Sequence, residues 1–427
     1  MTQANKHSSY NFIDLFAGAG GLSEGFIQAG FYPVAHVEMN EHAAKTLETR
    51  SAYYYLKGID KLEFYRQYLS GTITRAEFTQ MIPDSVTNTV INETLSNETI
   101  PRVFDTIDGI MKTRGIDKID VIVGGPPCQA YSLVGRAQSS HMGTPMREDP
   151  RNYLYKLYAQ FLEKYQPRMF VFENVLGIAS AQGGGIWREL QETLKQVGYE
   201  IECHAQNAQN FGVLQNRRRM IIVGWLKHSG LAYPDFLVKK ADAIVNDLFT
   251  DLPKLYPGES NNNYSEEKPS NYVMETGIRT VDDILTLQIC RPNIARDITI
   301  YKRAIELWNK GHQRLNYNDL PEELKTHRNR HSFIDRFKVV EGDENCCHTV
   351  LAHLSKDGHY FIHPDIDQHR SITVREAARI QSFPDSYYFE GPRTSQFMQI
   401  GNAVPPLMAR GIAEGVFSQL HGGVNGQ

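Results

Sequence analysis

Residues 12–21 read FIDLFAGAGG, an apolar run that ends in a glycine-rich turn. Such a run before a turn is typical of a buried strand, so we predict a strand over residues 12–16. A helix at 22–29 and a second strand at 33–37 complete a βαβ unit. The alternation recurs, with further strands expected at 119–123, 169–172 and 220–225 and helices near 152–164 and 186–197. The predicted fold class is α/β, with a doubly wound, mostly parallel, Rossmann-like sheet.

Length and composition indicate a globular protein of two domains. The chain has 427 residues, of which 41% are hydrophobic and 22% charged, and domains mostly contain about 100–200 residues. No apolar run approaches the ~20 residues of a membrane-spanning helix, and the first residues lack the apolar stretch of a signal peptide. We therefore expect a cytoplasmic protein without a membrane partner.

The apolar periodicity fails after residue 226, where Pro, Gly and Asn punctuate a polar segment. This change predicts the start of a second, irregular domain. Helical order returns at Thr373, because the sequence TVRE offers a capping box. The last helix is expected to start at residues 405–406, two prolines suited to a first helical turn, and to run towards Leu420.

The turn after the first predicted strand has the features of a nucleoside-cofactor site. Gly18 and Gly20 allow the backbone to approach a ligand closely, and Glu38 can accept hydrogen bonds from ribose hydroxyls. A dinucleotide fingerprint would have a third glycine where Ser23 stands, so an uncharged adenosyl group is better served than a pyrophosphate. We therefore favour S-adenosylmethionine as the cofactor, with a plain tight turn as the alternative interpretation.

Residues 124–129, GGPPCQ, put Cys128 on a rigid turn at the end of a predicted parallel strand. Ligands bind at that edge of open α/β sheets, and a buried structural cysteine rarely follows two prolines in a loop. The five cysteines of the chain contain no Cys-x-x-Cys pair, so we expect neither a disulfide framework nor a metal site. The Gly- and Ser-rich residues 130–150 resemble a lid that closes over a substrate. Cys128 is therefore a candidate nucleophile.

The next predicted strand ends in FENV, residues 172–175, which brings a carboxyl group to the same sheet edge as Cys128. Apolar neighbours favour a protonated carboxyl group, so Glu173 is a candidate proton donor. Helix capping by Glu173 or Asn174 is the alternative role. Three consecutive arginines at 217–219 lead into the last predicted strand and require anionic partners such as carboxylate or phosphate if they are buried.

Six motifs occur in order along the chain: DLFAGAGG at 14–21, GGPPCQAYS at 124–132, FENV at 172–175, QNRRR at 215–219, TVREAARIQSFP at 373–384 and QIGNAVPP at 399–406. Together they resemble the motif set of the DNA (cytosine-5) methyltransferases. The resemblance implies a catalytic, S-adenosylmethionine-binding domain over residues 10–227 and 393–427. It also implies a smaller, irregular target-recognition domain over residues 228–392.

The resemblance further implies methyl transfer to C5 of a cytosine that is flipped out of double-stranded DNA. Cys128 would attack C6 of the base to form a covalent adduct, while Glu173 would bind and protonate the N3 edge. The other implied residues fall into three groups. Arg217 and Arg219 would support the base pocket and Glu173; the cofactor contacts would be Phe16, Ala17, Gly18, Gly20, Glu38, Met39, Pro127, Asn402 and Val404; the DNA contacts would be Gln129, Ser132, Arg136 and Thr349.

Two departures from the family pattern concern the adenine of the cofactor. Met39 stands where some relatives have a tryptophan that stacks on the ring. The acidic residue that binds the adenine amino group should precede the third predicted strand, and Asp105, Asp108 and Glu93 are all candidates. They lie within residues 47–114, a polar, Tyr-rich stretch that we interpret as an insertion at the sheet edge.

In this family, target recognition belongs to the stretch between the QNRRR and TVREAARIQSFP motifs. Its portion 291–338 contains eleven Lys or Arg against six Asp or Glu, although the whole chain carries a net charge of −4. These cations suit phosphate contact or guanine reading, while a solvated helical face is the commoner cause of such an excess. The residues singled out are Arg291, Arg296, Arg303, Arg314, Arg328, Arg330, Arg336 and Lys338.

We expect a stand-alone, monomeric bacterial or phage modification enzyme of a restriction system, with a cognate endonuclease that acts independently. Three other functions stay open. A tRNA-directed member of the same family would share Cys128 and Glu173. A nicotinamide-dependent oxidoreductase fits the glycine turn, and a non-catalytic DNA-binding relative fits the overall pattern.

Overall fold

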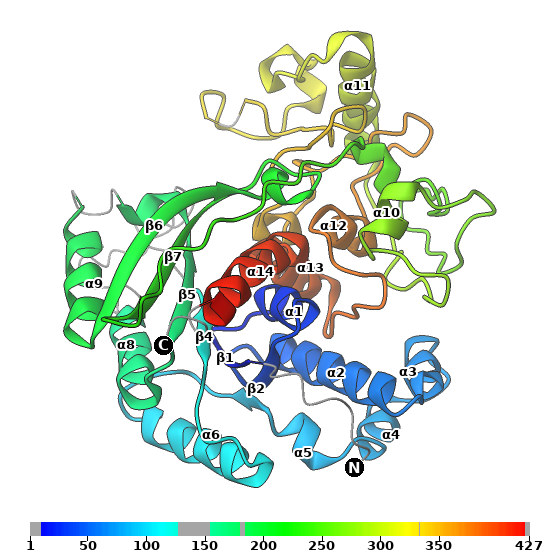
Figure 1. The fold of residues 1–427 in the computed structure, drawn as a ribbon. Coiled ribbons are helices and arrows are strands. Elements are labelled where there is room, and N and C mark those ends of the chain that lie inside the picture. The colour runs from blue at the N-terminus through cyan, green and yellow to red at the C-terminus, as the bar shows by residue number, and fades with distance from the viewer. Residues whose placement is uncertain (1–9, 127–153, 180–183, 333, 423–427) are drawn as a thin grey trace.

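A single seven-stranded sheet with helices on both faces organises the molecule (Figure 1). The computed structural model describes residues 10–126, 154–179, 184–332 and 334–422. The strand order is β3-β2-β1-β4-β5-β7-β6; the first five strands in this order are parallel, and β7 is antiparallel to both of its neighbours. The strands are β1 (Asn11–Leu15), β2 (Tyr32–Glu38), β3 (Val90–Asn92), β4 (Val121–Gly124), β5 (Met169–Asn174), β6 (Tyr199–Asn207) and β7 (Arg218–Leu226). The predicted doubly wound, mostly parallel α/β sheet is confirmed.

The order of connection reverses between β1 and β4, which lie side by side in the middle of the sheet. Leu15, the last residue of β1, pairs with Val37 on β2 and with Gly124 on β4. In open α/β sheets, ligands bind in the crevice outside the carboxyl ends of the strands at such a switch point. The turns after β1, β4 and β5 all leave the sheet at this edge.

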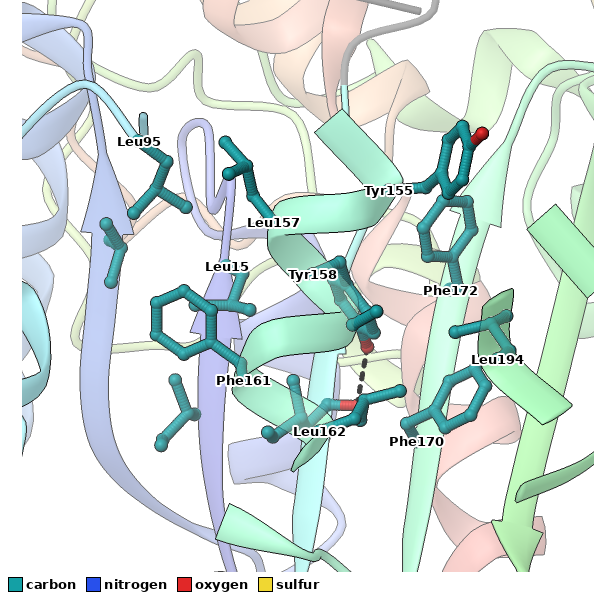
Figure 2. Packing of buried hydrophobic residues seen from close by; sticks show 14 of the residues in the cluster. Leu15, Leu95, Tyr155, Leu157, Tyr158, Phe161, Leu162, Phe170, Phe172 and Leu194 are labelled. Carbon is teal, nitrogen blue, oxygen red and sulfur yellow. Dashed lines mark hydrogen bonds between the residues drawn. The ribbon is translucent and has the colours of Figure 1, made fainter. Parts of the chain in front are cut away.

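In the described chain, three helices cover one face of the sheet: α6 (Ile100–Arg114), α8 (Leu154–Tyr165) and α9 (Gly185–Gln196). Helix α8 forms because its apolar residues recur at intervals of three and four, and Figure 2 shows them directed at the strands. The hydroxyl of Tyr158 is buried among these residues and donates a hydrogen bond to the carbonyl of Ile122 on β4, at 3.0 Å. This bond satisfies the buried hydroxyl of Tyr158.

The opposite face is covered by α1 (Gly21–Gln28) and α14 (Pro406–Gly422). Pro406 opens α14, as expected for a helix that starts at the proline pair. The two helices are in close contact at Gly25, where a Cβ would lie 2.3 Å from the backbone nitrogen of Arg410. The first and last parts of the chain therefore pack together beside the turn that follows β1.

We predict that Gly25→Ala destabilises the protein by about 1–3 kcal/mol, because the added methyl group overpacks the contact between α1 and α14. Gly109→Ala is the matched control, since Gly109 lies inside α6 and a Cβ there meets no atom within 4 Å. That variant should gain about 0.5–1 kcal/mol from the better helix propensity of alanine. Urea unfolding of both variants measures the difference, and equal stabilities would contradict the packing argument.

Both edges of the sheet differ in detail from the sequence-based expectation. The stretch interpreted as an insertion is mostly helical and supplies the edge strand β3. At the other edge, β6 was not predicted, because its residues are mostly polar, only its first residue is buried, and few apolar residues mark it as a strand. The helices of the first edge are α2 (Glu41–Gly58), α3 (Leu62–Leu69), α4 (Arg75–Gln80) and α5 (Asp84–Thr87), followed by α6.

The segment after β7 is irregular, as predicted, with only α10 (Asn271–Glu275) and α11 (Ala295–Gly311) as α-helices before residue 374 in the described chain. A small apolar core joins α11 to residues 315–339 and Ile362, and this unit stands at the top of Figure 1. A second core combines residues 245–287 with residues 340–403. It also includes Ala19, in the turn after β1, and Leu214, in the connection between β6 and β7. The irregular segment is therefore attached to the sheet through a shared core.

Helix α12 (Val374–Ile380) lies inside this shared core, ahead of α13 (Arg393–Asn402). The predicted capping box is confirmed, because the Thr373 side chain accepts from the Glu376 backbone while the Glu376 side chain accepts from the Thr373 backbone. Arg379 is fully buried and pairs with Asp251 and Asp385, each at 2.6 Å. These ion pairs fasten the irregular segment to α12.

Candidate active site

The turn between β1 and α1 has three residues in the left-handed backbone region: Phe16, Gly18 and Gly20, with φ of 57°, 55° and 78°. Gly18 is favoured by its φ, since a Cβ there would meet no atom of the described chain within 4 Å. Gly20 is also constrained by space, because a Cβ would lie 2.7 Å from the Leu47 side chain and 2.8 Å from the Tyr387 hydroxyl. The backbone of this turn therefore has open space beside Gly18 and tight packing at Gly20.

Glu38 holds this turn against the end of β2. One carboxylate oxygen accepts from the backbone nitrogen of Gly18 and the other from that of Asn40, both at 2.7 Å. Burial raises the pKa of Glu38, and the backbone hydrogen bonds oppose this effect. Met39, the next residue, is 61% exposed. The predicted pair of a glycine turn and an acidic residue at the second strand end is thus brought together.

The structure separates the three acidic candidates that lie before β4. Asp108 lies on α6, where its carboxylate binds Lys164 and Tyr165 away from the strand ends, and Asp105 lies on the same helix. Glu93 follows β3 directly, next to Asn92, whose side-chain amide donates to the carbonyl oxygen of Glu38 at 2.8 Å. Asn92 was not among the site residues predicted from the sequence. The short apolar pair before it, Val90 and Ile91, is the sequence feature that indicates a strand ending there.

The two glycines at the end of β4 lie against Leu15 and Glu173. A Cβ on Gly124 would lie 2.1 Å from the carbonyl oxygen of Leu15, and one on Gly125 would lie 2.7 Å from the carbonyl oxygen and 2.9 Å from Oε2 of Glu173. Both positions therefore require glycine. Residues 127–153 lie outside the described part of the chain; they include Pro127, Cys128, Gln129, Ser132, Arg136 and the expected lid at 130–150.

Glu173 at the end of β5 forms an ion pair with Arg219, whose Nε lies 2.8 Å from Oε1, and both side chains are about seven-eighths buried, with 14% and 13% exposed. Arg219 reaches this edge because β7 runs antiparallel to β5, so the start of β7 lies beside the end of β5. At the following turn, the side chain of Asn174 accepts from the backbone nitrogen of Val175. Of the two residues considered for a capping role, Asn174 therefore forms the hydrogen bond within the turn. The Glu173 carboxylate faces Arg219 instead.

The three consecutive arginines have three different environments. Arg219 alone has a carboxylate partner in the described chain, and Arg218 is exposed. Arg217 is fully buried and donates to two backbone carbonyls, those of Val350 at 2.8 Å and Gly401 at 3.1 Å. Burial and the neighbouring Arg219 lower the pKa of Arg217. In the described chain Arg217 therefore has backbone carbonyl oxygens where anionic partners were expected, because two of its nitrogens bind carbonyl groups of distant segments.

The remaining predicted residues lie around the same edge. Asn402 ends α13 with an exposed side chain, and Val404 is buried against α1, where a Cβ on Gly21 would lie 2.2 Å from its carbonyl oxygen. Thr349 donates to the carbonyl oxygen of Asn216 at 2.6 Å, beside the arginine run. The described part of the site therefore joins β1, β2, β4, β5 and β7 to the C-terminal motif.

The sheet order and a site at its switch point define a Rossmann-like, doubly wound fold. A solved E. coli structure described as a DNA modification methyltransferase encoded within a prophage aligns with a TM-score of 0.59 at 24% identity, covering 97% of this chain and 100% of that one. The Entamoeba histolytica methyltransferase EhMeth aligns with a TM-score of 0.55 at 15% identity, covering 97% and 99%. At these identities the likeness concerns the fold.

The sequence pattern of the C-5 cytosine-specific DNA methylase family matches residues 10–67 and 87–418. The chain belongs to this family, which confirms the resemblance. Type II methyltransferase M.Bpa9945I of Bacillus paralicheniformis is 40% identical, over 96% of this chain and 99% of that protein. Type II methyltransferase M1.HphI of Haemophilus parahaemolyticus is 29% identical, over 96% of this chain and 87% of that protein. Among the described helices, none combines the length and apolar character that a membrane crossing requires.

We predict that Arg219→Met lowers the methyl-transfer rate by about 10²-fold, because Glu173 loses the cation that orients its carboxylate. Arg218→Met is the matched control: it removes a neighbouring arginine whose side chain is exposed. Single-turnover methylation with saturating DNA and cofactor measures both variants. A similar loss of rate in both variants would show that the positive charge of residues 217–219 matters and that the ion pair between Glu173 and Arg219 does not.

Proposed function

We propose that this protein transfers a methyl group from S-adenosylmethionine to C5 of a cytosine within a specific double-stranded DNA sequence. One observation carries the proposal: Glu173, paired with Arg219, lies against Gly125, three residues before Cys128. A proton donor and a thiol nucleophile are thereby attached to neighbouring strand ends. Membership of the family and the type II methyltransferases among its relatives support the proposal.

The turn after β1 fits an adenosyl group. Each carboxylate oxygen of Glu38 accepts one hydrogen bond and retains lone pairs for ribose hydroxyls. In the described chain, the space beside Gly18 is open. Met39, which follows Glu38, and Asn402, in the QIGNAVPP motif, are both exposed. When bound, S-adenosylmethionine supplies the electrophilic methyl group of its sulfonium. The residues proposed to hold it are Phe16, Ala17, Gly18, Gly20, Glu38, Met39, Pro127, Asn402 and Val404, with Glu93 or Asn92 towards the adenine.

The chemistry of cytosine explains why a thiolate and a carboxylic acid work together. C6 is a poor electrophile until N3 takes up a proton, which Glu173 would donate. As Cys128 bonds to C6, the C5–C6 π electrons move towards C4, and the C4–N3 π pair becomes the lone pair that binds this proton. C5 is then an enamine carbon, whose π pair would bond to the methyl group as the bond between that group and the sulfonium sulfur breaks and leaves a neutral thioether. The N3 lone pair re-forms the C4–N3 double bond, with N3 still protonated. Removal of the C5 proton by a base restores the double bond, expels the thiolate and returns the N3 proton to Glu173.

The substrate must leave the duplex, because C6 is hidden in the base stack. We propose that Gln129, Ser132, Arg136 and Thr349 contact the DNA around the flipped base, and that residues 228–392 recognise the target. Within that segment, most of the basic residues singled out already bind carboxylates or carbonyls. Arg303 and Arg328 are exposed, and no partner is recorded for either side chain in the described chain. These two arginines are the first candidates for DNA contact.

By analogy with its type II relatives, the protein is proposed to act as a monomeric, cytoplasmic modification enzyme of a restriction system, beside an endonuclease that acts independently. Bisulfite sequencing of DNA from cells that express the protein identifies the methylated sequence. Transfer of tritiated methyl groups to duplex DNA and to tRNA compares the two substrate classes. Label in tRNA alone would favour the tRNA-directed alternative.

We predict that Cys128→Ser abolishes turnover and covalent trapping on DNA that contains 5-fluorocytosine. Fluorine at C5 blocks the final elimination, so the wild-type adduct persists and migrates as a complex in denaturing gels. Cys203→Ser is the control, because Cys203 is a free, half-buried cysteine on β6. Trapping by the Cys128 variant would identify another residue as the nucleophile.

We predict that Glu173→Gln lowers the single-turnover rate by roughly 10²–10⁴-fold, the usual scale of acid–base assistance. The amide keeps the size of the side chain but cannot deliver a carboxylic acid proton to N3. Glu163→Gln, the same change at an exposed position of α8, should behave like the wild-type protein. An unchanged rate in the Glu173 variant would refute its role as the acid.

A further inference from the structure

Tyr387 joins the segment between α12 and α13 to the turn after β1. Its side chain is 1% exposed, and its hydroxyl donates a hydrogen bond to the carbonyl oxygen of Ala19 at 2.5 Å. The two residues are 368 positions apart in the sequence. Burial raises the pKa of Tyr387, so the hydroxyl remains a donor at neutral pH.

The bond acts on the part of the turn that lies between its two glycines. Gly18 is held from one side by Glu38, and the backbone nitrogen of Gly20 donates to the carbonyl oxygen of Ala17 at 2.9 Å. The Ala19 carbonyl has a side-chain partner from a distant segment instead. Because glycines flank Ala19 and allow many backbone conformations, an outside contact is needed to select one.

Tyr387 is itself rigidly supported. Its ring packs edge-on against Phe383, with ring centres 4.8 Å apart, and the Arg50 guanidinium lies 4.8 Å from its ring centre. The backbone carbonyl of Tyr387 accepts from the Arg375 side chain of α12 at 3.0 Å. Arg50 forms hydrogen bonds of 2.6 and 2.8 Å with Glu24 on α1. The hydroxyl is therefore presented to Ala19 by a buried framework that spans α1, α2 and α12.

We propose that Tyr387 is a positioning residue for S-adenosylmethionine, which acts by fixing the Ala19 carbonyl and thereby the Gly18–Gly20 turn. The inference rests on the proposed cofactor site and adds a residue outside it. The inference predicts that loss of the Tyr387 hydroxyl weakens cofactor binding indirectly. The turn is the part proposed to contact the cofactor, and Tyr387 acts only by holding the turn in place.

The test is Tyr387→Phe, which removes the hydroxyl and keeps the ring. Isothermal titration of the full-length protein with S-adenosylmethionine, without DNA, should show binding weakened about three- to tenfold, the scale of one lost hydrogen bond. The KM for the cofactor should rise by a similar factor, while kcat at saturating cofactor stays within about twofold. The split between KM and kcat separates positioning of the turn from a general loss of active protein.

Two matched variants complete the experiment. Tyr388→Phe makes the same change one residue on, at a hydroxyl with no recorded hydrogen bond in the described chain, and should bind like the wild type. Tyr65→Phe removes a buried hydrogen bond of 2.8 Å to the Ser386 carbonyl, beside Tyr387 but without contact to the turn. It should lower the melting temperature and leave cofactor affinity unchanged.

Each outcome bears on the inference. Weaker binding in Tyr387→Phe alone supports it. Wild-type affinity in Tyr387→Phe, or equal weakening in Tyr65→Phe, overturns it and leaves the proposed function standing. Failure of the wild-type protein to bind S-adenosylmethionine overturns the proposed function and this inference together.

Discussion

Close backbone packing at the carboxyl ends of β1, β4 and β5 is the constraint on which the site depends. A side chain at Gly124 would collide with the Leu15 carbonyl, and one at Gly125 would collide with Glu173. Glycine therefore allows the chain that leads towards Cys128 to leave the sheet beside the candidate acid. Parallel strands deliver their following turns to one edge, so the glycine turn after β1 meets these residues there.

Because β7 is antiparallel to β5, it brings the residues at its start to the edge where the parallel strands end. Its first residues, and not its last, lie beside the end of β5. Arg219 thereby reaches Glu173, while the side chain of Arg217, two residues earlier, is buried in the interior. A buried guanidinium needs bonds for its donors, and Arg217 finds two of them at the carbonyls of Val350 and Gly401. One short motif consequently orients a carboxylate and fastens two distant segments to the sheet.

Those attachments explain why the second half of the chain is not an independent appendage. Arg379 fastens the irregular segment to α12 through buried ion pairs, and Tyr387 carries the connection on to Ala19. The apolar core around α12 also includes residues of the sheet side. By contrast, the unit around α11 has a core of its own. The division at residues 228 and 393 remains a prediction, and the shared core indicates that the boundary in space is less sharp than the boundary in sequence.

Much of the fold could be predicted because its signals are local. The apolar run before Gly18, the capping box at Thr373 and the proline at 406 each act within a few residues, and each predicts an element that the structure contains. The expectation failed where local signals were weak. Strand β6 is polar and gains its place by pairing with β7. The second half of α2 and the helices α3, α4 and α5 carry aromatic and aliphatic side chains that pack mostly against one another.

The sequence by itself determined the strands β1, β2, β4, β5 and β7, the glycine turn and the identity of the candidate acid and nucleophile, because spacing and residue chemistry are properties of neighbouring residues. Only the tertiary structure decided which arginine contacts Glu173, which residue of β3 contacts Glu38, and which tyrosine holds Ala19. Each of these choices depends on strand direction and on which buried polar groups still need partners after packing. That requirement connects residues hundreds of positions apart, which no local pattern encodes.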